Sequence, residues 1–190
     1  MIRITGGEWK NHSLLTPHHR KTRPTHARLR EALFHSVLAW IPEARVLDLF
    51  AGSGALGFEA LSRGAAHVDF VEVSQSACDI IKKNIRQFNV QSKVRVFCSD
   101  FEKWSFQSFE NKYDLVLADP PYSQGFEKKL IHKIEWQNLL NDEGLFCLES
   151  AKRDGVWEAS EFLVKIREKT YGDSQLTTFQ KRENQTSEVS

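Results

Sequence analysis

The 190-residue sequence predicts an α/β fold, in which a mostly parallel sheet of seven strands carries helices on both faces. Short apolar runs alternate along the chain with segments whose apolar residues recur at helical spacing, which is typical of such a sheet. Glycines at positions 52, 54 and 57 follow the apolar run 46–50, as expected where a buried strand enters a tight turn before a helix. The length and the absence of repeats or a low-complexity linker indicate one main domain.

The chain begins with a small extension ahead of this domain. Residues 3–5 and 12–15 are expected to form a β-hairpin, and residues 17–24 a basic loop. We therefore divide the chain into a basic N-terminal extension (1–24), a main domain (25–180) and a polar tail expected to be disordered (181–190).

Each element of the main domain has its own local signal. Thr25 is a suitable N-cap for the first helix, which runs to about residue 39 and is ended by Pro42. A cap at Ser74 or Ser76 opens the helix that continues to about residue 88. The other expected helices are 55–62 and 126–134, and the expected strands are 46–50, 67–73, 94–98, 113–117 and 145–148, with a terminal hairpin at 162–166 and 176–179.

The glycine turn suggests a nucleotide-type ligand. Gly52 to Gly57 matches G-x-G-x-x-G, and Glu72 follows at the spacing of an acid that binds ribose hydroxyls, so a dinucleotide has to be considered. A P-loop is excluded because no Gly-Lys-Ser/Thr follows. Asp48, at the mouth of the strand, would repel a pyrophosphate and attract an ammonium group. S-adenosylmethionine carries an ammonium and no phosphate, so we favour it over a nicotinamide or flavin cofactor.

A second motif follows the apolar run 113–117. Asp119-Pro120-Pro121-Tyr122 ends this strand abruptly and leaves few backbone donors at its carboxyl end, where α/β sheets bind ligands. The Asp119 carboxylate and the Pro120 carbonyl are then two acceptors that suit the NH2 group of a base, on which Tyr122 can stack. The expected catalytic residues are Asp119, Pro120, Pro121 and Tyr122.

These motifs carry a resemblance to a known family. D-L-F-A-G-S-G at 48–54 and D-P-P-Y at 119–122 resemble the class I S-adenosylmethionine-dependent methyltransferases that modify amino nitrogens. The opening I-R-I-T-G-G-E-W-K, R-P-T-H-A-R-L-R-E-A-L-F at 23–34 and Y-G-D-S-Q-L-T at 171–177 are similar to the bacterial 16S ribosomal RNA guanine-N2 methyltransferases of the RsmD type. The resemblance runs from Met1 to about Phe179, and His26 is a local departure from the family pattern.

The resemblance implies a Rossmann-like class I methyltransferase fold that transfers a methyl group from S-adenosylmethionine to the N2 amine of one guanine in 16S rRNA. The implied substrate is the assembled small ribosomal subunit. In this class an acid after the third strand receives the adenine amino group, and Asp100 takes that place, with Phe101 beside the ring. The expected cofactor-binding residues are Asp48, Phe50, Gly52, Gly54, Glu72, Val73, Asp100 and Phe101. Because the acids among them and Asp119 end successive strands, they are expected to line one crevice.

Charge is distributed unevenly along the chain. The net charge is only +1, yet residues 1–30 hold seven Lys and Arg residues against a single acid, Glu8. A basic arm on a near-neutral body favours contact with RNA phosphates. The expected RNA-binding residues are Arg3, Lys10, Arg20, Lys21, Arg23 and Arg28.

The remaining composition limits the class of protein. Three separated cysteines, without a C-x-x-C pair, are expected to be reduced thiols and give no metal site. No signal peptide or apolar stretch of 18 residues is present, so we expect a cytoplasmic, membrane-free protein. We also expect a monomer. Three alternatives stay open: an adenine-N6 or protein-glutamine methyltransferase, a nonenzymatic RNA-binding protein that keeps the fold, and a nicotinamide-dependent oxidoreductase.

Overall fold

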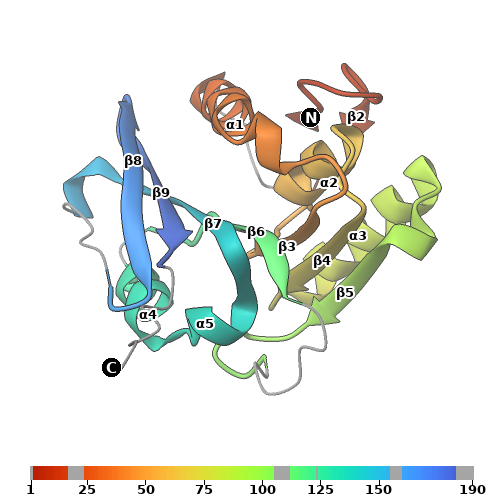
Figure 1. The fold of residues 1–190 in the computed structure, drawn as a ribbon. Coiled ribbons are helices and arrows are strands. Elements are labelled where there is room, and N and C mark those ends of the chain that lie inside the picture. The colour runs from red at the N-terminus through yellow and green to blue at the C-terminus, as the bar shows by residue number, and fades with distance from the viewer. Residues whose placement is uncertain (1, 17–23, 105–111, 123, 155–159, 183–190) are drawn as a thin grey trace.

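A computed structural model describes residues 2–16, 24–104, 112–122, 124–154 and 160–182. Its main sheet has seven strands in the order β5-β4-β3-β6-β7-β9-β8, and a separate two-stranded sheet pairs β1 with β2 (Figure 1). The pairs among β3, β4, β5, β6 and β7 are parallel, whereas β9 runs antiparallel to both β7 and β8. The expected mostly parallel seven-stranded sheet and the N-terminal hairpin are thus confirmed.

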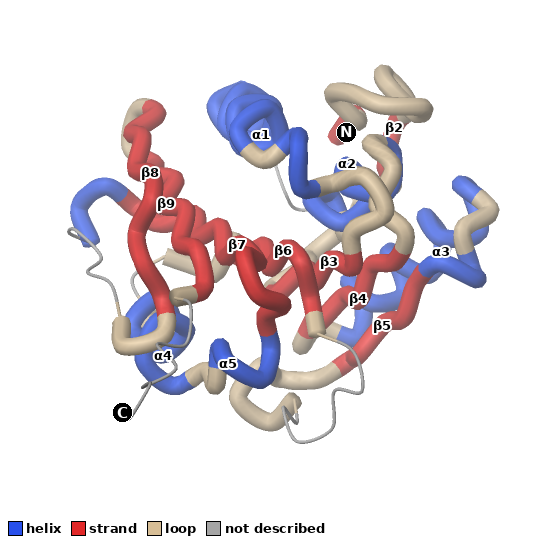
Figure 2. Tube along the Cα trace, in the orientation of Figure 1, coloured by secondary structure: helices blue, strands red, loops and turns tan. Residues whose placement is uncertain are grey.

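The elements follow the chain in the expected alternation (Figure 2). The strands are β1 Ile2–Arg3, β2 Ser13–Leu14, β3 Arg45–Leu49, β4 His67–Glu72, β5 Val94–Cys98, β6 Tyr113–Ala118, β7 Leu140–Ala151, β8 Leu163–Tyr171 and β9 Ser174–Lys181. The α-helices are α1 Pro24–Ser36, α2 Ala55–Ser62, α3 Gln75–Phe88, α4 Phe126–Lys133 and α5 Trp136–Leu139, and short 3-10 turns are η1 Leu38–Trp40, η2 Gln91–Lys93 and η3 Lys152–Asp154.

Two apolar cores cover the two faces of the sheet. On one face, α1, α2 and α3 pack against alternate residues of the strands, with Phe34, Phe58 and Phe70 fully buried among them. On the other face, α4 and α5 cover the remaining residues, with Trp136 and Phe146 in tilted ring contact at 4.3 Å between centroids (Figure 1). Burial on both faces explains why the central strands are nearly continuous apolar runs.

The N-terminal hairpin is fixed to α1 and α2 by one buried carboxylate. Glu59 of α2 is fully buried and accepts hydrogen bonds from Thr5 N–H at 2.9 Å and from Arg63 Nη2 at 2.8 Å. Arg30 of α1 lies 3.4 Å from Glu59 and donates to the carbonyl oxygen of Arg3 at 2.7 Å. Arg30 is therefore buried in an internal ion cluster and does not face an external anion.

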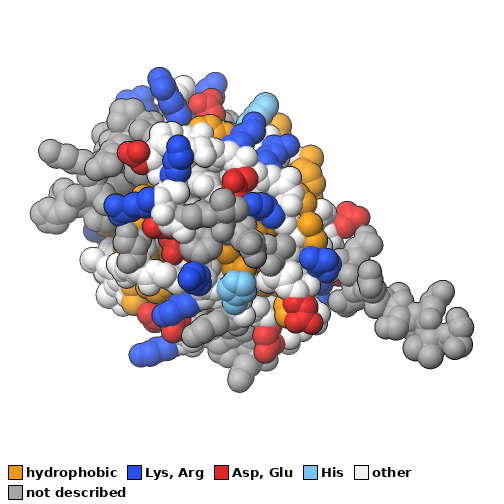
Figure 3. All heavy atoms as spheres, turned by 90° about the vertical axis from the view of Figure 1, so that its left-hand side faces the viewer, with side chains coloured by type: hydrophobic (Ala, Val, Ile, Leu, Met, Phe, Trp, Pro, Cys, Tyr) orange, Lys and Arg blue, Asp and Glu red, His pale blue; other side chains and the backbone are white. Residues whose placement is uncertain are grey.

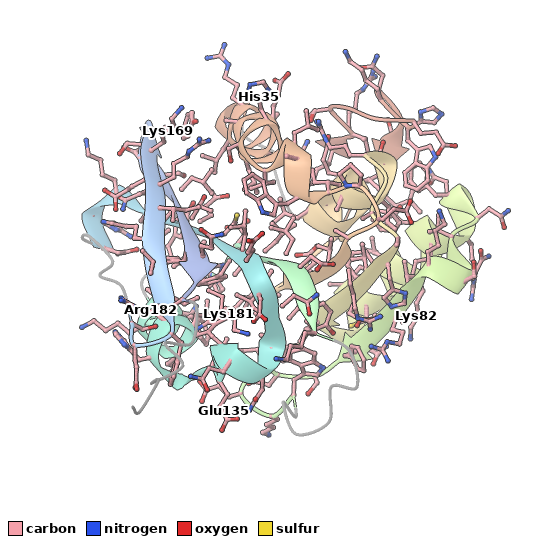
Figure 4. All side chains as sticks on the ribbon, viewed as in Figure 1. His35, Lys82, Glu135, Lys169, Lys181 and Arg182 are labelled. Carbon is pink, nitrogen blue, oxygen red and sulfur yellow. The ribbon has the colours of Figure 1, made fainter. Side chains whose placement is uncertain are left out.

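Several boundaries differ from expectation, at the first helix, which ends at Ser36 and not near residue 39, and at the last strand. The first helix begins at Pro24, a favourable first helical residue, so Thr25 lies inside the helix. Lys181, which we placed in the tail, is the last residue of β9, and its Nζ donates to the Leu140 carbonyl at 3.0 Å (Figure 4). No helix in the described ranges is long and apolar enough to cross a membrane.

Candidate active site at the carboxyl edge of the sheet

The four acids expected to bind ligand lie at one edge of the sheet. Asp48 is near the end of β3 and Glu72 ends β4, while Asp100 and Asp119 follow β5 and β6. β3 pairs with β4 on one side and with β6 on the other, and β5 is the next strand beyond β4. All four strands run in parallel, so their carboxyl ends meet, and the carboxylates of Asp119 and Glu72 act electrostatically on Asp48.

The glycine turn follows β3 closely. Gly52 and Gly54 have φ values of 57° and 80°, in the left-handed region that favours glycine. A Cβ on Gly54 would come within 2.9 Å of the Phe58 ring, and one on Gly57 within 2.2 Å of the Phe70 ring. The glycines therefore allow both the tight turn and the close packing of α2 on the sheet.

Asp48 is the most perturbed carboxylate at this edge. It is 1% exposed, and its Oδ2 accepts a hydrogen bond from Gly57 N–H at 2.9 Å. Its Oδ1 is buried and has no hydrogen-bond partner among the described residues. Burial raises the pKa of Asp48 to about 8, and the charges of Asp119 and Glu72 add to the rise, while the bond from Gly57 opposes it. Among the described residues, no hydrogen-bond donor or cation contacts the Oδ1 atom of Asp48, so this atom could accept one from a ligand.

Glu72 is held in place by the backbone. Its Oε2 accepts from Gly52 N–H at 2.7 Å and its Oε1 from Ser74 N–H at 2.8 Å. Each carboxylate oxygen has a second lone pair, so Glu72 can still accept two hydroxyl groups side by side. Ser74 also caps α3, which settles the choice between Ser74 and Ser76.

An aromatic cluster lies between β3, β5 and α4. Phe50, Phe101 and Phe126 form this cluster, with ring centroids 5.0 Å apart for Phe50–Phe101, 5.2 Å for Phe50–Phe126 and 5.6 Å for Phe101–Phe126. Phe50 and Phe101 were expected here. Sequence analysis missed Phe126, whose only signal was its position at the start of a helix soon after D-P-P-Y.

The other expected cofactor residues sit beside the ends of β4 and β5. Val73, directly after Glu72, is 66% exposed. Asp100 is half-buried, and its Oδ1 accepts from Glu102 N–H at 2.8 Å, which fixes the turn after β5. An exposed apolar surface and a carboxylate at neighbouring strand ends suit a flat heterocycle with an amino group.

The D-P-P-Y segment follows β6 directly. Asp119 is half-buried, Pro120 is buried and Pro121 is exposed. The hydroxyl of Tyr122 donates to Glu149 Oε1 at 2.7 Å and lies 3.0 Å from Ser174 Oγ. Burial and the charge of Glu149 raise the pKa of Tyr122 above its usual value, so the hydroxyl stays protonated.

The expected RNA-binding residues are placed in part. Arg3, Lys10 and Arg28 are exposed. Arg20, Lys21 and Arg23 lie outside the described residues. Among the described residues, no group of three His, Cys, Asp or Glu side chains could hold a metal ion.

This arrangement defines a class of protein: a Rossmann-like methyltransferase fold with a glycine turn and four acids at one sheet edge. The chain belongs to the family described as Conserved hypothetical protein 95, which matches residues 2–180. Ribosomal RNA small subunit methyltransferase D of Escherichia coli is 34% identical over 180 residues, covering 95% of this chain and 90% of that protein. The protein of the same name from Haemophilus influenzae is 31% identical over 173 residues, covering 90% and 89%.

Solved structures agree with this assignment. The structure of yhhF from Escherichia coli matches with a TM-score of 0.85 and 32% identity, covering 95% of this chain and 98% of that chain. The structure of HI0767 from Haemophilus influenzae matches with a TM-score of 0.80 and 29% identity, covering 96% and 99%. The family resemblance and the fold expected from the sequence are confirmed.

Proposed function

We propose that this protein transfers a methyl group from S-adenosylmethionine to the N2 amine of a guanine in 16S rRNA, within the small ribosomal subunit. The observation that carries the proposal is the meeting of Asp48, Glu72, Asp100 and Asp119 at one edge of four neighbouring parallel strands. The relatives named Ribosomal RNA small subunit methyltransferase D support the choice of substrate.

The residues at this edge fit the cofactor. The buried Oδ1 of Asp48, which has no partner among the described residues, suits an ammonium group. Glu72 suits the ribose hydroxyls, and Asp100 the adenine amino group, with the ring among Val73, Phe101 and the rest of the aromatic cluster. When bound, the sulfonium of S-adenosylmethionine supplies an electrophilic methyl group.

The D-P-P-Y segment of the protein then binds and orients the amine. Guanine must leave its stack for its amino group to reach this edge. The Asp119 carboxylate and the Pro120 carbonyl accept its two N–H bonds and aim the nitrogen lone pair at the methyl group, while Tyr122 stacks on the base. No base is needed before attack, because the amine proton becomes acidic only as the new N–C bond forms and the bond between the methyl carbon and sulfur breaks. The proton then passes to the Asp119 carboxylate or to water. Most of the rate enhancement comes from positioning and charge placement.

Basic side chains supply the contacts to RNA phosphates. The exposed Arg3, Lys10 and Arg28 belong to the N-terminal extension and α1. Lys and Arg side chains are also spread, among acidic ones, over the face on which β8 lies (Figure 3). Exposed Arg167 and Lys169 of β8 contribute to that face, so RNA contact need not be limited to the extension.

The test is transfer of a labelled methyl group to small-subunit particles that lack the modification, followed by mapping of the modified nucleoside. We expect label in N2-methylguanosine of 16S rRNA. Label in N6-methyladenosine or in protein would favour the alternative methyltransferases. Binding of a nicotinamide cofactor in place of S-adenosylmethionine in a parallel titration would refute the proposed chemistry.

A further inference from the structure

The hydroxyl of Tyr122 is held at two points by the C-terminal part of the sheet. It donates to Glu149 Oε1 at 2.7 Å and lies 3.0 Å from Ser174 Oγ. Since the single hydroxyl proton of Tyr122 goes to the carboxylate, its oxygen accepts from the hydroxyl of Ser174. A bond from a neutral hydroxyl to a charged carboxylate is among the stronger hydrogen bonds in proteins.

The two partners come from neighbouring strands and share one face of the sheet. In the antiparallel pairing of β7 with β9, Glu149 is opposite Leu176 and Ala151 is opposite Ser174. Residues two apart on a strand point to the same face, so Glu149 and Ser174 are diagonal neighbours there. Ser174 is 6% exposed. Both anchors are therefore parts of a rigid sheet rather than of a loop.

This contact gives a role to a motif that the cofactor site leaves unused. Ser174 is the first residue of β9 and the last of the Y-G-D-S segment at 171–174, in which Gly172 and Asp173 form the turn between β8 and β9. The turn is also tied to the end of β7, because Lys152 N–H donates to the Asp173 carbonyl at 2.8 Å. The terminal hairpin contributes none of the four acids, yet it reaches the D-P-P-Y segment through Tyr122.

We propose that Glu149 and Ser174 are positioning residues that lock the ring plane of Tyr122 for stacking on the target base. This inference rests on the proposed function. A phenol with a free hydroxyl could turn about two side-chain torsions, whereas one anchored at its far end keeps one orientation. The two hydrogen bonds to the Tyr122 hydroxyl therefore affect kcat for the bound base and leave the cofactor site unchanged.

The experiment compares labelled-methyl transfer to small-subunit particles by wild type, Y122F, E149A, E149Q and S174A, with cofactor affinity measured by calorimetry. We expect about tenfold lower kcat for Y122F and E149A, and cofactor Kd within about twofold of wild type. E149Q should keep most of the activity, because its amide oxygen still accepts from Tyr122. The matched control is Y171F, which removes a hydroxyl from the same hairpin and should keep wild-type kcat.

A double-mutant cycle distinguishes an effect of Glu149 through Tyr122 from a general effect of Glu149 on the structure. If Glu149 acts through Tyr122, the Y122F/E149A protein is no slower than the slower single variant. Losses that multiply, wild-type kcat in E149A, or equal losses in E149Q and E149A would overturn the inference; the last result would assign the role to the charge of Glu149, which also acts on Arg30. If E149A does not fold, Y122F, E149Q and S174A decide. Failure of the proposed function is distinct, because wild type itself would then transfer no label.

Discussion

Replacing Asp48 with asparagine should stabilise the cofactor-free protein while weakening cofactor binding. The carboxyl group of Asp48 is buried beside two other acids, and its pKa is raised to about 8. In the unfolded chain the same group has a pKa of about 4. Folding at neutral pH therefore requires Asp48 to take up a proton, and this uptake opposes folding.

The size of the effect follows from the two pKa values. A raised pKa of an acid contributes stability fully below about pH 4, and the contribution is lost as pH rises towards 8. A pH of 7 lies roughly three units above the pKa of Asp48 in the unfolded chain, and each unit corresponds to about 1.4 kcal/mol. At pH 7 the raised pKa therefore lowers the free energy of unfolding by about 4 kcal/mol. Asparagine keeps an acceptor for Gly57 N–H and titrates no proton. We expect D48N to be more stable by about 2–4 kcal/mol at pH 7.

The assay is urea unfolding of the cofactor-free proteins from pH 5 to pH 8. The stability gap between D48N and wild type should widen by about 1.4 kcal/mol per pH unit and level off near pH 8. D79N, on the exposed surface of α3, makes the same change of charge and should stay within about 0.5 kcal/mol of wild type. A gap that is absent at pH 7, or that narrows as pH rises, would refute the reasoning.

Cofactor binding should respond in the opposite sense. An ammonium group binds the ionised form of Asp48, so wild-type affinity for S-adenosylmethionine should rise as pH approaches 8. D48N should lose at least about tenfold in affinity at pH 8 and show a flatter pH profile. Equal affinity of wild type and D48N for the cofactor in calorimetry would show that the ammonium group does not bind Asp48.

Three further predictions concern the same edge of the sheet and the basic extension. Asp119→Ala should lower kcat at least about a hundredfold in the labelled-methyl assay while cofactor Kd stays within about tenfold; near wild-type turnover would contradict its role. Phe126→Ala should raise cofactor Kd roughly three- to tenfold in calorimetry, because one wall of the aromatic cluster is lost; an unchanged Kd would exclude Phe126 from the site. Charge reversal of Arg20, Lys21 and Arg23 should weaken binding to small-subunit RNA and flatten its salt dependence, and an unchanged salt slope would remove them from the interface.

The elements that place the site could be predicted because their signals are local. The predicted strand 46–50 is β3, which spans Arg45–Leu49 and is followed by the glycine turn, and α2 spans residues 55–62 as expected. Because these strands are parallel and adjacent, Asp48, Glu72, Asp100 and Asp119 lie at one edge of the sheet. Their positions at the ends of predicted strands were therefore enough to predict that they meet. β7 was predicted too short, because polar residues at its start and end obscure a strand that pairs on both sides.

Contacts between distant segments could not be predicted in the same way. Arg30 is a poor residue for the first turns of a helix by local rules, and only the fold reveals its partner Glu59. Phe126 and Glu149 have no local signal for their contacts, since each depends on a strand or helix formed elsewhere. The burial that raises the pKa of Asp48 likewise depends on the packing of the whole sheet, and the charges that add to the rise come from Glu72 and Asp119, 24 and 71 residues away.

The attachment of the first hairpin has a consequence for how a newly made chain folds. Thr5 and Arg3 leave the ribosome first, but the groups they bind, Glu59 of α2 and Arg30 of α1, follow only later. The partner of Leu15 is synthesised later still. The Leu15 N–H donates to Asn84 Oδ1 of α3 at 2.9 Å, and Asn84 Nδ2 donates to the Leu15 carbonyl at 3.1 Å. The N-terminal hairpin thus docks only once about half of the chain has been synthesised. A protein that lacks its first five residues would leave the buried carboxylate of Glu59 without the N–H and the hydroxyl of Thr5, which both donate to it.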